Sequence, residues 1–222
     1  MKKLFALLFF FSSFLILNAQ DKKLNLIVGT YTKSCDSKGI YVYEFDSKTA
    51  DFKFKNSSEN IINPSYLSVS NDNKFVYSVS ENDNKSSISA FGYNSKSGKL
   101  DFINHQNPNG LNPCYVINDD KNVITANYSS GNISVLGKNI DGSIGEAKQL
   151  VQHTGKSINT NRQEAAHAHM VYFSPDKKYV LANDLGTDKV YVYQYNPNSQ
   201  TEVLKLKSSV NCTPGSGPRH LI

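Results

Sequence analysis

The chain has 222 residues, a formal net charge of +5, 39% hydrophobic residues and 19% charged residues. This composition is too apolar and too weakly charged for a disordered protein. The positive charge forms no basic block that could follow a phosphate backbone, so nucleic-acid binding is not expected. Only two of the 24 basic residues are arginines, Arg162 and Arg219, and their forked guanidinium groups make both candidate ligands for anions.

The N-terminus has the pattern of a secretory signal peptide. Two lysines precede an apolar run over residues 4–17, and residues 18–20 (NAQ) offer a cleavage site. The run is short for a membrane span, and no second long apolar run follows it. The sequence therefore predicts a signal peptide over residues 1–20 and an exported chain, periplasmic or extracellular, with no attachment to a membrane after cleavage.

A repeat of about 50 residues runs through the rest of the chain. Its units open on similar segments, and the equivalent positions are spaced by 49, 55 and 50 residues. The openings are NPSYLSVS (63–70), NPCYV (112–116), AHMVYFS (168–174) and GPRHL (217–221). Polar turns and short runs rich in Val, Ile, Tyr and Phe follow each opening, which is typical of β-strands. The expected strands cover residues 26–31, 39–45, 52–55, 75–79, 88–93, 123–126, 133–136, 179–182 and 190–195.

Four short strands in a unit of about 50 residues are typical of a β-propeller blade. The sequence predicts an all-β fold in which residues 21–222 form about four four-stranded blades, and the chain ends as a new blade opens. We therefore expect part of a larger propeller, with an apolar blade face and a strand edge left open. A β-solenoid is the structural alternative, although its repeats are usually shorter.

The unit openings carry the main candidate functional residues, because the innermost strands of a propeller line its central channel. Ser65, Cys114, His169 and Arg219 occupy the same position in successive openings. We expect these four side chains to converge at one mouth of the channel. His169 and Arg219 are the two with catalytic potential.

Loops next to the openings add four candidates for substrate binding. Arg162 and His167 precede the third opening, His220 follows the fourth, and Asp184 comes after an inner strand. The competing interpretation is that His167 and His169 are strand residues that hydrogen-bond locally and that Asp184 only stabilises a turn. Two further histidines are expected in solvated loops: His105 and His153.

No metal and no cofactor are expected. His167 and His169 alternate along a strand and would share one face, but no Asp or Cys follows at a useful ligand spacing. The three cysteines lie far apart without a zinc-binding pattern, and we expect them to act as small buried residues. They are Cys35, Cys114 and Cys212.

Several segments together resemble the lactonase family of seven-bladed β-propellers. They are VGTYT (28–32), ANYSSGN (126–132), RQ (162–163), HAH (167–169), FSPD (173–176), DLGTD (184–188) and PGSGPRH (214–220). Single pieces such as SPD occur in many propellers, but this combination in this order is specific. The resemblance implies a ring of seven blades and hydrolysis of a sugar lactone, of the 6-phosphogluconolactonase type.

The resemblance also implies a pocket at the channel mouth built from a His, an Arg and a Glu. The His matches His169, with His167 as second choice, and the Arg matches Arg219; the Glu would fall on the next inner strand, beyond this sequence. In this hypothesis a neutral His169 takes a proton from the attacking water, and Arg219 holds the developing oxyanion or an anionic group of the substrate. Arg162 and His220 would position the sugar acid.

The sequence leaves three functions open. The preferred one is a hydrolase whose partner is a small-molecule sugar lactone. The second is a non-catalytic propeller that binds carbohydrate or protein in the same pocket, and the third is a cycloisomerase of the muconate type. Because phosphorylated gluconolactone is a cytoplasmic metabolite, an exported hydrolase would meet a different lactone. The sequence yields no prediction of the oligomeric state.

Overall fold

The computed structural model describes residues 23–222, so the predicted signal peptide over residues 1–20 lies outside the described residues. The described chain folds into fifteen β-strands and one short 3-10 turn, η1 (Asp83–Lys85). No helix in this part of the chain has the length and apolarity to cross a bilayer. Every strand predicted from the sequence is present, which confirms an all-β fold.

The strands form four antiparallel sheets, and each sheet contains consecutive strands in chain order. Blade 1 contains β1 (Lys23–Gly29), β2 (Ile40–Asp46) and β3 (Phe52–Ser58). Blade 2 contains β4 (Leu67–Val69), β5 (Phe75–Ser80), β6 (Ser87–Asn94) and β7 (Lys99–Gln106). Blade 3 contains β8 (Pro113–Asn118), β9 (Asn122–Asn127), β10 (Asn132–Lys138) and β11 (Ile144–Gln152). Blade 4 contains β12 (Ala168–Phe173), β13 (Tyr179–Asp184), β14 (Lys189–Tyr195) and β15 (Leu204–Asn211).

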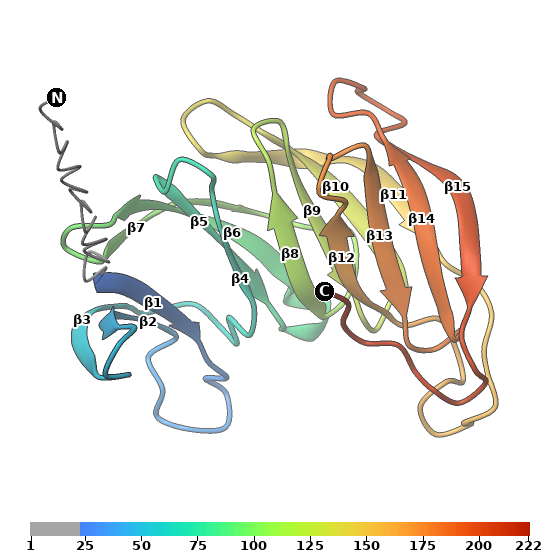
Figure 1. Ribbon diagram of the computed structural model, residues 1–222, viewed down its shortest axis with the longest axis horizontal. Helices are drawn as coiled ribbons and strands as arrows, with labels where there is room; N and C mark the ends of the chain where they lie inside the picture. Colours follow the sequence, from blue (N-terminus) through green and yellow to red (C-terminus); the bar gives the residue numbers. More distant parts are fainter. Residues whose placement is uncertain (1–22) are drawn as a thin grey trace, which may run out of the picture.

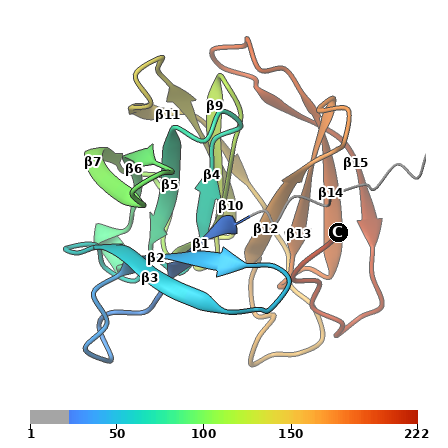
Figure 2. The same cartoon turned by 60° about the vertical axis from the view of Figure 1, so that its left-hand side comes forward.

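The sheets follow one another as the blades of a propeller do (Figure 1). The first strand of blade 3, β8, contacts the first strands β4 and β12 of the blades on either side, and Figure 2 shows the same succession with blade 1 in front. Blade 1 has three strands in the described chain, and β1 corresponds to the second strand of the other repeats. No inner strand precedes it within residues 23–222.

Successive blades are held together by apolar side chains from facing sheets. Three buried clusters lie between blades 1 and 2, 2 and 3, and 3 and 4. Strand β9 contributes to two of them, because Val123 packs toward blade 2 and its neighbour Ile124 toward blade 4. Alternate residues of a strand point to opposite faces, so a blade with neighbours on both sides is apolar on both.

Apolar side chains remain exposed on the two terminal blades, as expected for blades that lack a neighbour on one side. They are Leu24, Leu26, Phe52 and Phe54 on blade 1 and Leu206 and Val210 on blade 4. In the described chain, β1 pairs only with β2 and so leaves one strand edge open.

The last segment, residues 212–222, returns from the outer strand β15 to the inner side of the sheets. The backbone N–H of Leu221 lies 3.2 Å from Sδ of Met170 in β12, and the ring of His220 lies 5.8 Å from that of Tyr115 in β8. The C-terminus therefore lies beside β8 and β12 (Figure 1). This return brings Arg219 to the inner ends of the blades.

Candidate functional site

A pocket of about 480 Å³ lies at the inner ends of the four sheets. Ser65, Cys114, His169 and Arg219, which the repeat places at equivalent positions, all line it. Arg162 and His220 line it as well. The remaining lining residues are Tyr31, Tyr66, Glu81 and Tyr128.

The repeat itself explains this convergence. Ser65 precedes β4, Cys114 lies in β8, His169 lies in β12 and Arg219 lies in the returning segment. Each blade enters the centre along the same path, so one position per repeat presents its side chain to the same space. Four different side chains thereby meet although they are about 50 residues apart in sequence.

The imidazole of His169 is buried and neutral at pH 7. Burial, together with the positive charges of Arg219 and His220, lowers the pKa of His169 to about 4. The rings of Tyr128 and His220 approach it edge-on, with centroids 5.8 and 5.3 Å away. Its Nδ1 is buried, and neither ring nitrogen has a hydrogen-bond partner within residues 23–222. His169 is therefore a free neutral imidazole.

Two guanidinium groups face the same pocket. Arg219 forms no hydrogen bond or ion pair with any described residue, and its side chain is exposed. Arg162 donates from Nη2 to the hydroxyl of Tyr128 at 3.2 Å and leaves its other donors free. Because planar guanidinium groups bind carboxylate and phosphate in a bidentate manner, this side of the pocket suits an anion.

Asp188, in the turn after β13, anchors the loop that carries Arg162. Gln163 is almost fully buried and donates from Nε2 to Asp188 Oδ1 and to the carbonyl of Leu185, both at 2.8 Å. The backbone N–H of Arg162 donates to the carbonyl of Asn159 at 3.0 Å within the same loop. The position of Arg162 therefore depends on a neighbour that Asp188 holds in place.

The same carboxylate anchors the segment that carries Arg219. Asp188 accepts the backbone N–H of Gly217 at 2.7 Å. It also accepts the backbone N–H of Gly215 and the hydroxyl of Ser157. Both glycines have positive φ angles, +54° and +83°, which turn their N–H groups toward one acceptor. Although burial opposes ionisation, these hydrogen bonds hold the pKa of Asp188 below its usual range.

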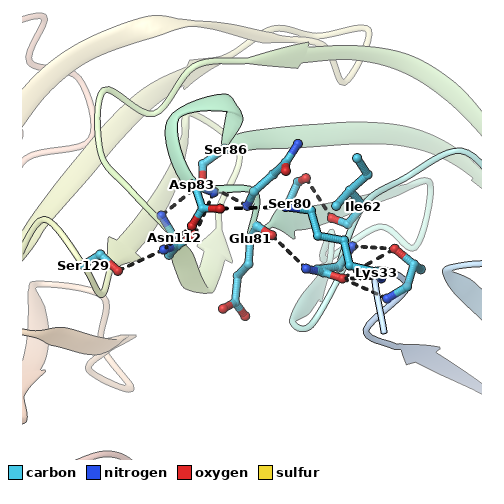
Figure 3. A network of polar contacts seen from close by, with 11 residues as sticks. Lys33, Ile62, Ser80, Glu81, Asp83, Ser86, Asn112 and Ser129 are labelled. Atoms are coloured by element: carbon cyan, nitrogen blue, oxygen red, sulfur yellow. Dashed lines mark hydrogen bonds and ion pairs between the residues drawn. The ribbon is translucent and has the colours of Figure 1, made fainter. Parts of the chain in front are cut away.

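Asparagine side chains at two blade openings connect each blade to the one before it, and Figure 3 shows this for Asn112. Asn63 Oδ1 accepts the backbone N–H groups of Thr32 and Lys33 at 2.8 and 3.1 Å. Asn112 Oδ1 accepts that of Asp83 at 2.9 Å. Both asparagines have a positive φ angle, a conformation that Asn tolerates better than most residues.

His167 occupies the corresponding position in blade 4 and makes a similar contact. Its Nδ1 lies 3.0 Å from the carbonyl oxygen of Tyr128 in blade 3, and its Nε2 lies 3.0 Å from Glu164 Oε1. The ring also stacks on Tyr128 at 4.5 Å. His167 was expected to contact substrate, but it lies outside the pocket lining and its ring nitrogens already have partners.

Asp184 also lies outside the pocket lining, inside blade 4. Its Oδ2 accepts Nδ1–H of His153 at 2.7 Å, and its Oδ1 accepts three backbone N–H groups, including that of His167 at 2.9 Å. The Nε2 of His153 in turn accepts the hydroxyl of Tyr193 at 2.7 Å. Although burial opposes it, the hydrogen bond from His153 and those from the backbone lower the pKa of Asp184.

The expectation of a solvated His153 is therefore wrong, because this ring is almost fully buried between Asp184 and Tyr193. His105 is exposed as expected, although it lies in strand β7 rather than in a loop. The residues next to His153 in the sequence are polar and therefore suggested solvent exposure. Its hydrogen-bond partners, Asp184 and Tyr193, are more than 30 residues away in the sequence, so the local composition does not predict them.

The cysteines show no sign of a redox or nucleophilic role. Burial raises the pKa of the Cys114 thiol to about 12, with a further contribution from the charge of Glu81. Such a thiol is almost fully protonated at pH 7 and is a poor nucleophile. Cys35 is exposed, contrary to the expected burial, and Cys212 is half-buried; none of the three is in a disulfide within residues 23–222.

Sequence reasoning missed Glu81 and Tyr128 as pocket residues. Each directly follows the second strand of its repeat, since β5 ends at Ser80 and β9 ends at Asn127. The residue directly after the second strand of a blade is thus another equivalent position whose side chain lines the pocket. The signal was therefore present in the repeat alignment, because Glu81 and Tyr128 both lie two positions beyond the end of a predicted second strand (75–79 and 123–126).

Comparison with known proteins agrees with this architecture. Residues 25–222 match the family described as lactonase, 7-bladed beta-propeller. The chain belongs to the lactonase family of seven-bladed β-propellers.

The chain is also similar to proteins of known name and to solved structures. The chain is 38% identical over 196 residues to the 6-phosphogluconolactonase of Bacillus subtilis, covering 87% of this chain and 54% of the relative. The crystal structure of a Bacteroides fragilis protein matches with a TM-score of 0.86 and 41% identity over 91% of this chain and 58% of that chain. The periplasmic gluconolactonase of Pseudomonas aeruginosa matches with a TM-score of 0.81 and 32% identity, over 90% of this chain and 58% of that one. The chain thus spans a little over half the length of these relatives.

Proposed function

We propose that the protein hydrolyses a sugar lactone, in the manner of a 6-phosphogluconolactonase. The observation that carries this proposal is the pairing, in one pocket, of a buried neutral His169 with the unpartnered guanidinium of Arg219. Similarity to known proteins supports the same reaction, because two of the relatives are a 6-phosphogluconolactonase and a gluconolactonase.

In the proposed reaction, water attacks the lactone carbonyl at the inner ends of the blades. The oxygen of water bonds to the carbonyl carbon, and His169 accepts the proton that this water loses. Arg219 donates hydrogen bonds to the oxygen on which negative charge develops. Collapse of the intermediate breaks the ring C–O bond, the ring oxygen takes up the proton held by His169, and the open sugar acid leaves with His169 neutral again.

Binding of an anionic substrate would also improve His169 as a base. The pKa of about 4 makes the free imidazole a weak base at neutral pH, and the charge of Arg219 is one of its causes. A carboxylate or phosphate paired with Arg162 and Arg219 would offset that charge and raise the pKa of His169. The low pKa of His169 also favours the second candidate function, that of a propeller that binds a sugar acid without hydrolysing it.

Activity of the full-length gene product toward 6-phosphogluconolactone and gluconolactone tests the proposal. His169→Gln removes the base and should lower kcat/KM by about 10²–10⁴-fold. Arg219→Lys should lower it by about 10²-fold or more, because an ammonium cannot reproduce the planar fork. His105→Gln, an exposed histidine outside the pocket, is the matched control. Turnover of both lactones at the wild-type rate in the two pocket variants would refute the roles given to these residues; binding of the sugar acid without turnover would favour the binding protein.

We also propose that the protein is exported. The two lysines followed by an apolar run at the N-terminus support this location, and so does the similarity to a periplasmic gluconolactonase. N-terminal sequencing of the mature protein should start near Asp21. Recovery of the protein from the cytoplasmic fraction with its first 20 residues intact would contradict export.

A further inference from the structure

Glu81 is held so that its side chain enters the pocket from the side of blades 1 and 2. Its backbone carbonyl accepts Asn63 Nδ2 at 2.9 Å, and its backbone N–H donates to the carbonyl of Asn63 at 3.3 Å. Figure 3 shows Glu81 within this polar network, with its carboxylate pointing away from the network. The backbone is thus fastened while the carboxylate is directed toward the pocket.

One oxygen of this carboxylate is occupied and the other is free. Oε1 accepts the hydroxyl of Tyr31 at 2.9 Å and a short hydrogen bond from the hydroxyl of Ser65. Within residues 23–222, Oε2 accepts no hydrogen bond and Glu81 has no ion-pair partner. The pocket therefore contains a carboxylate whose orientation is set by two hydroxyl groups and whose second oxygen is free to accept a hydrogen bond from a ligand.

The charges of the pocket are separated. Arg162 donates to Tyr128, whose ring lies 5.8 Å from that of His169, and the ring of His220, the neighbour of Arg219, lies 5.3 Å from that of His169. The carboxylate of Glu81 instead binds the hydroxyl groups of Tyr31 and Ser65, on the side of blades 1 and 2. Cys114 lies in blade 3, between the blade that carries Glu81 and the blade that carries His169. One end of the pocket is cationic and the other is an acceptor surface.

We propose that Glu81, with Ser65 and Tyr31, forms a hydroxyl-binding subsite opposite the arginines. This inference rests on the proposed function and specifies the ligand of that site. An ionised carboxylate only accepts hydrogen bonds, so it binds hydroxyl groups and repels phosphate or carboxylate. A ligand that suits both ends carries an anionic group at one end and several hydroxyl groups at the other, as an acyclic sugar acid or its lactone does. Glu81 is then a specificity-determining residue that recognises the polyol.

Binding measurements separate the two ends. We expect Glu81→Gln to weaken 6-phosphogluconate binding by about 10-fold, because a hydrogen bond to a charged group is replaced by a neutral one. Binding of inorganic phosphate, which lacks a polyol, should stay within about twofold of wild type. Arg219→Lys should weaken the binding of both 6-phosphogluconate and inorganic phosphate. Glu44→Gln, a surface carboxylate paired with Lys23 on blade 1, is the matched control and should change neither.

Kinetics distinguish a binding role from a catalytic one. Glu81→Gln should raise KM for a polyhydroxylated lactone and leave kcat within about threefold, whereas loss of a general base would lower kcat. Ser65→Ala, which removes only one support of the carboxylate, should raise KM by a smaller factor. If Glu81→Gln lowers the melting temperature sharply, Ser65→Ala and Glu81→Asp keep the comparison possible.

Two outcomes would overturn the subsite: unchanged 6-phosphogluconate affinity in Glu81→Gln, or an equal loss of affinity for inorganic phosphate. The proposed hydrolysis can fail separately. A protein that turns over neither lactone but binds 6-phosphogluconate in a Glu81-dependent way would keep the subsite and reject the hydrolase. If the Glu81→Gln variant hydrolyses lactones as well as the wild type does, the proposed hydrolysis stands and the subsite is rejected.

Discussion

Replacing Asp188 by Asn should displace both arginines of the pocket at once. The carboxylate accepts Gln163 Nε2, the hydroxyl of Ser157 and two glycine N–H groups. An amide keeps one acceptor oxygen and turns an NH₂ group toward donors, so about half of these hydrogen bonds are lost. Hydrogen bonds to a charged group contribute roughly 1.5–3 kcal/mol each, and incomplete relaxation of the loops lowers the sum, which gives a loss of about 2–4 kcal/mol.

The assay has two readouts on the same variant. Urea unfolding should give the loss in free energy of unfolding, and titration with inorganic phosphate should show affinity falling by about 10-fold or more as the arginine-bearing loops loosen. Asp176→Asn, an exposed turn carboxylate that accepts the Ser174 hydroxyl at 2.7 Å, is the matched control and should change phosphate affinity little. Wild-type stability combined with wild-type phosphate affinity in Asp188→Asn would refute the argument that one carboxylate positions both loops.

Two further predictions concern buried groups away from the arginines. The pKa of Asp184 is lowered in the folded state, so its stabilising contribution is complete above the ordinary value of about 3.9 and is lost as pH falls through the folded value. The free energy of unfolding should therefore drop below about pH 4. His153→Phe should remove about 1–3 kcal/mol at pH 7, because Oδ2 of the buried Asp184 loses its hydrogen bond from His153 while Oδ1 keeps its three backbone donors. A pH-independent stability, or a His153→Phe variant as stable as wild type, would contradict this. Iodoacetamide at pH 8 should label the exposed Cys35 and spare Cys114, whose pKa is about 12, and mass spectrometry that finds Cys114 labelled as fast would contradict its burial.

The repeat made the fold and the centre of the site predictable. Once equivalent openings were aligned, the path of each blade followed, and Ser65, Cys114, His169 and Arg219 had to meet wherever the blades met. Nothing beyond the periodicity of the sequence was needed, because one position per repeat faces the same space.

Side chains that end strands were harder to assign, because a difference of one position decides where they point. Asp184 and Glu81 both lie where the second strand of a repeat ends, yet Asp184 turns back onto its own hairpin while Glu81 enters the pocket. Their surroundings, rather than their residue type, decide this. His167 was assignable in principle, since its repeat position is that of Asn63 and Asn112, which tie neighbouring blades together.

The arrangement of one pocket residue per blade opening separates chemistry from scaffolding. The backbone at these four places is shaped by packing between sheets, whereas the side chain that it presents is exchangeable from unit to unit: hydroxyl, thiol, imidazole and guanidinium already occupy the same slot. Substitution of the pocket residue in a single unit can therefore change the ligand that the pocket binds, while the pocket residues of the other units stay in place.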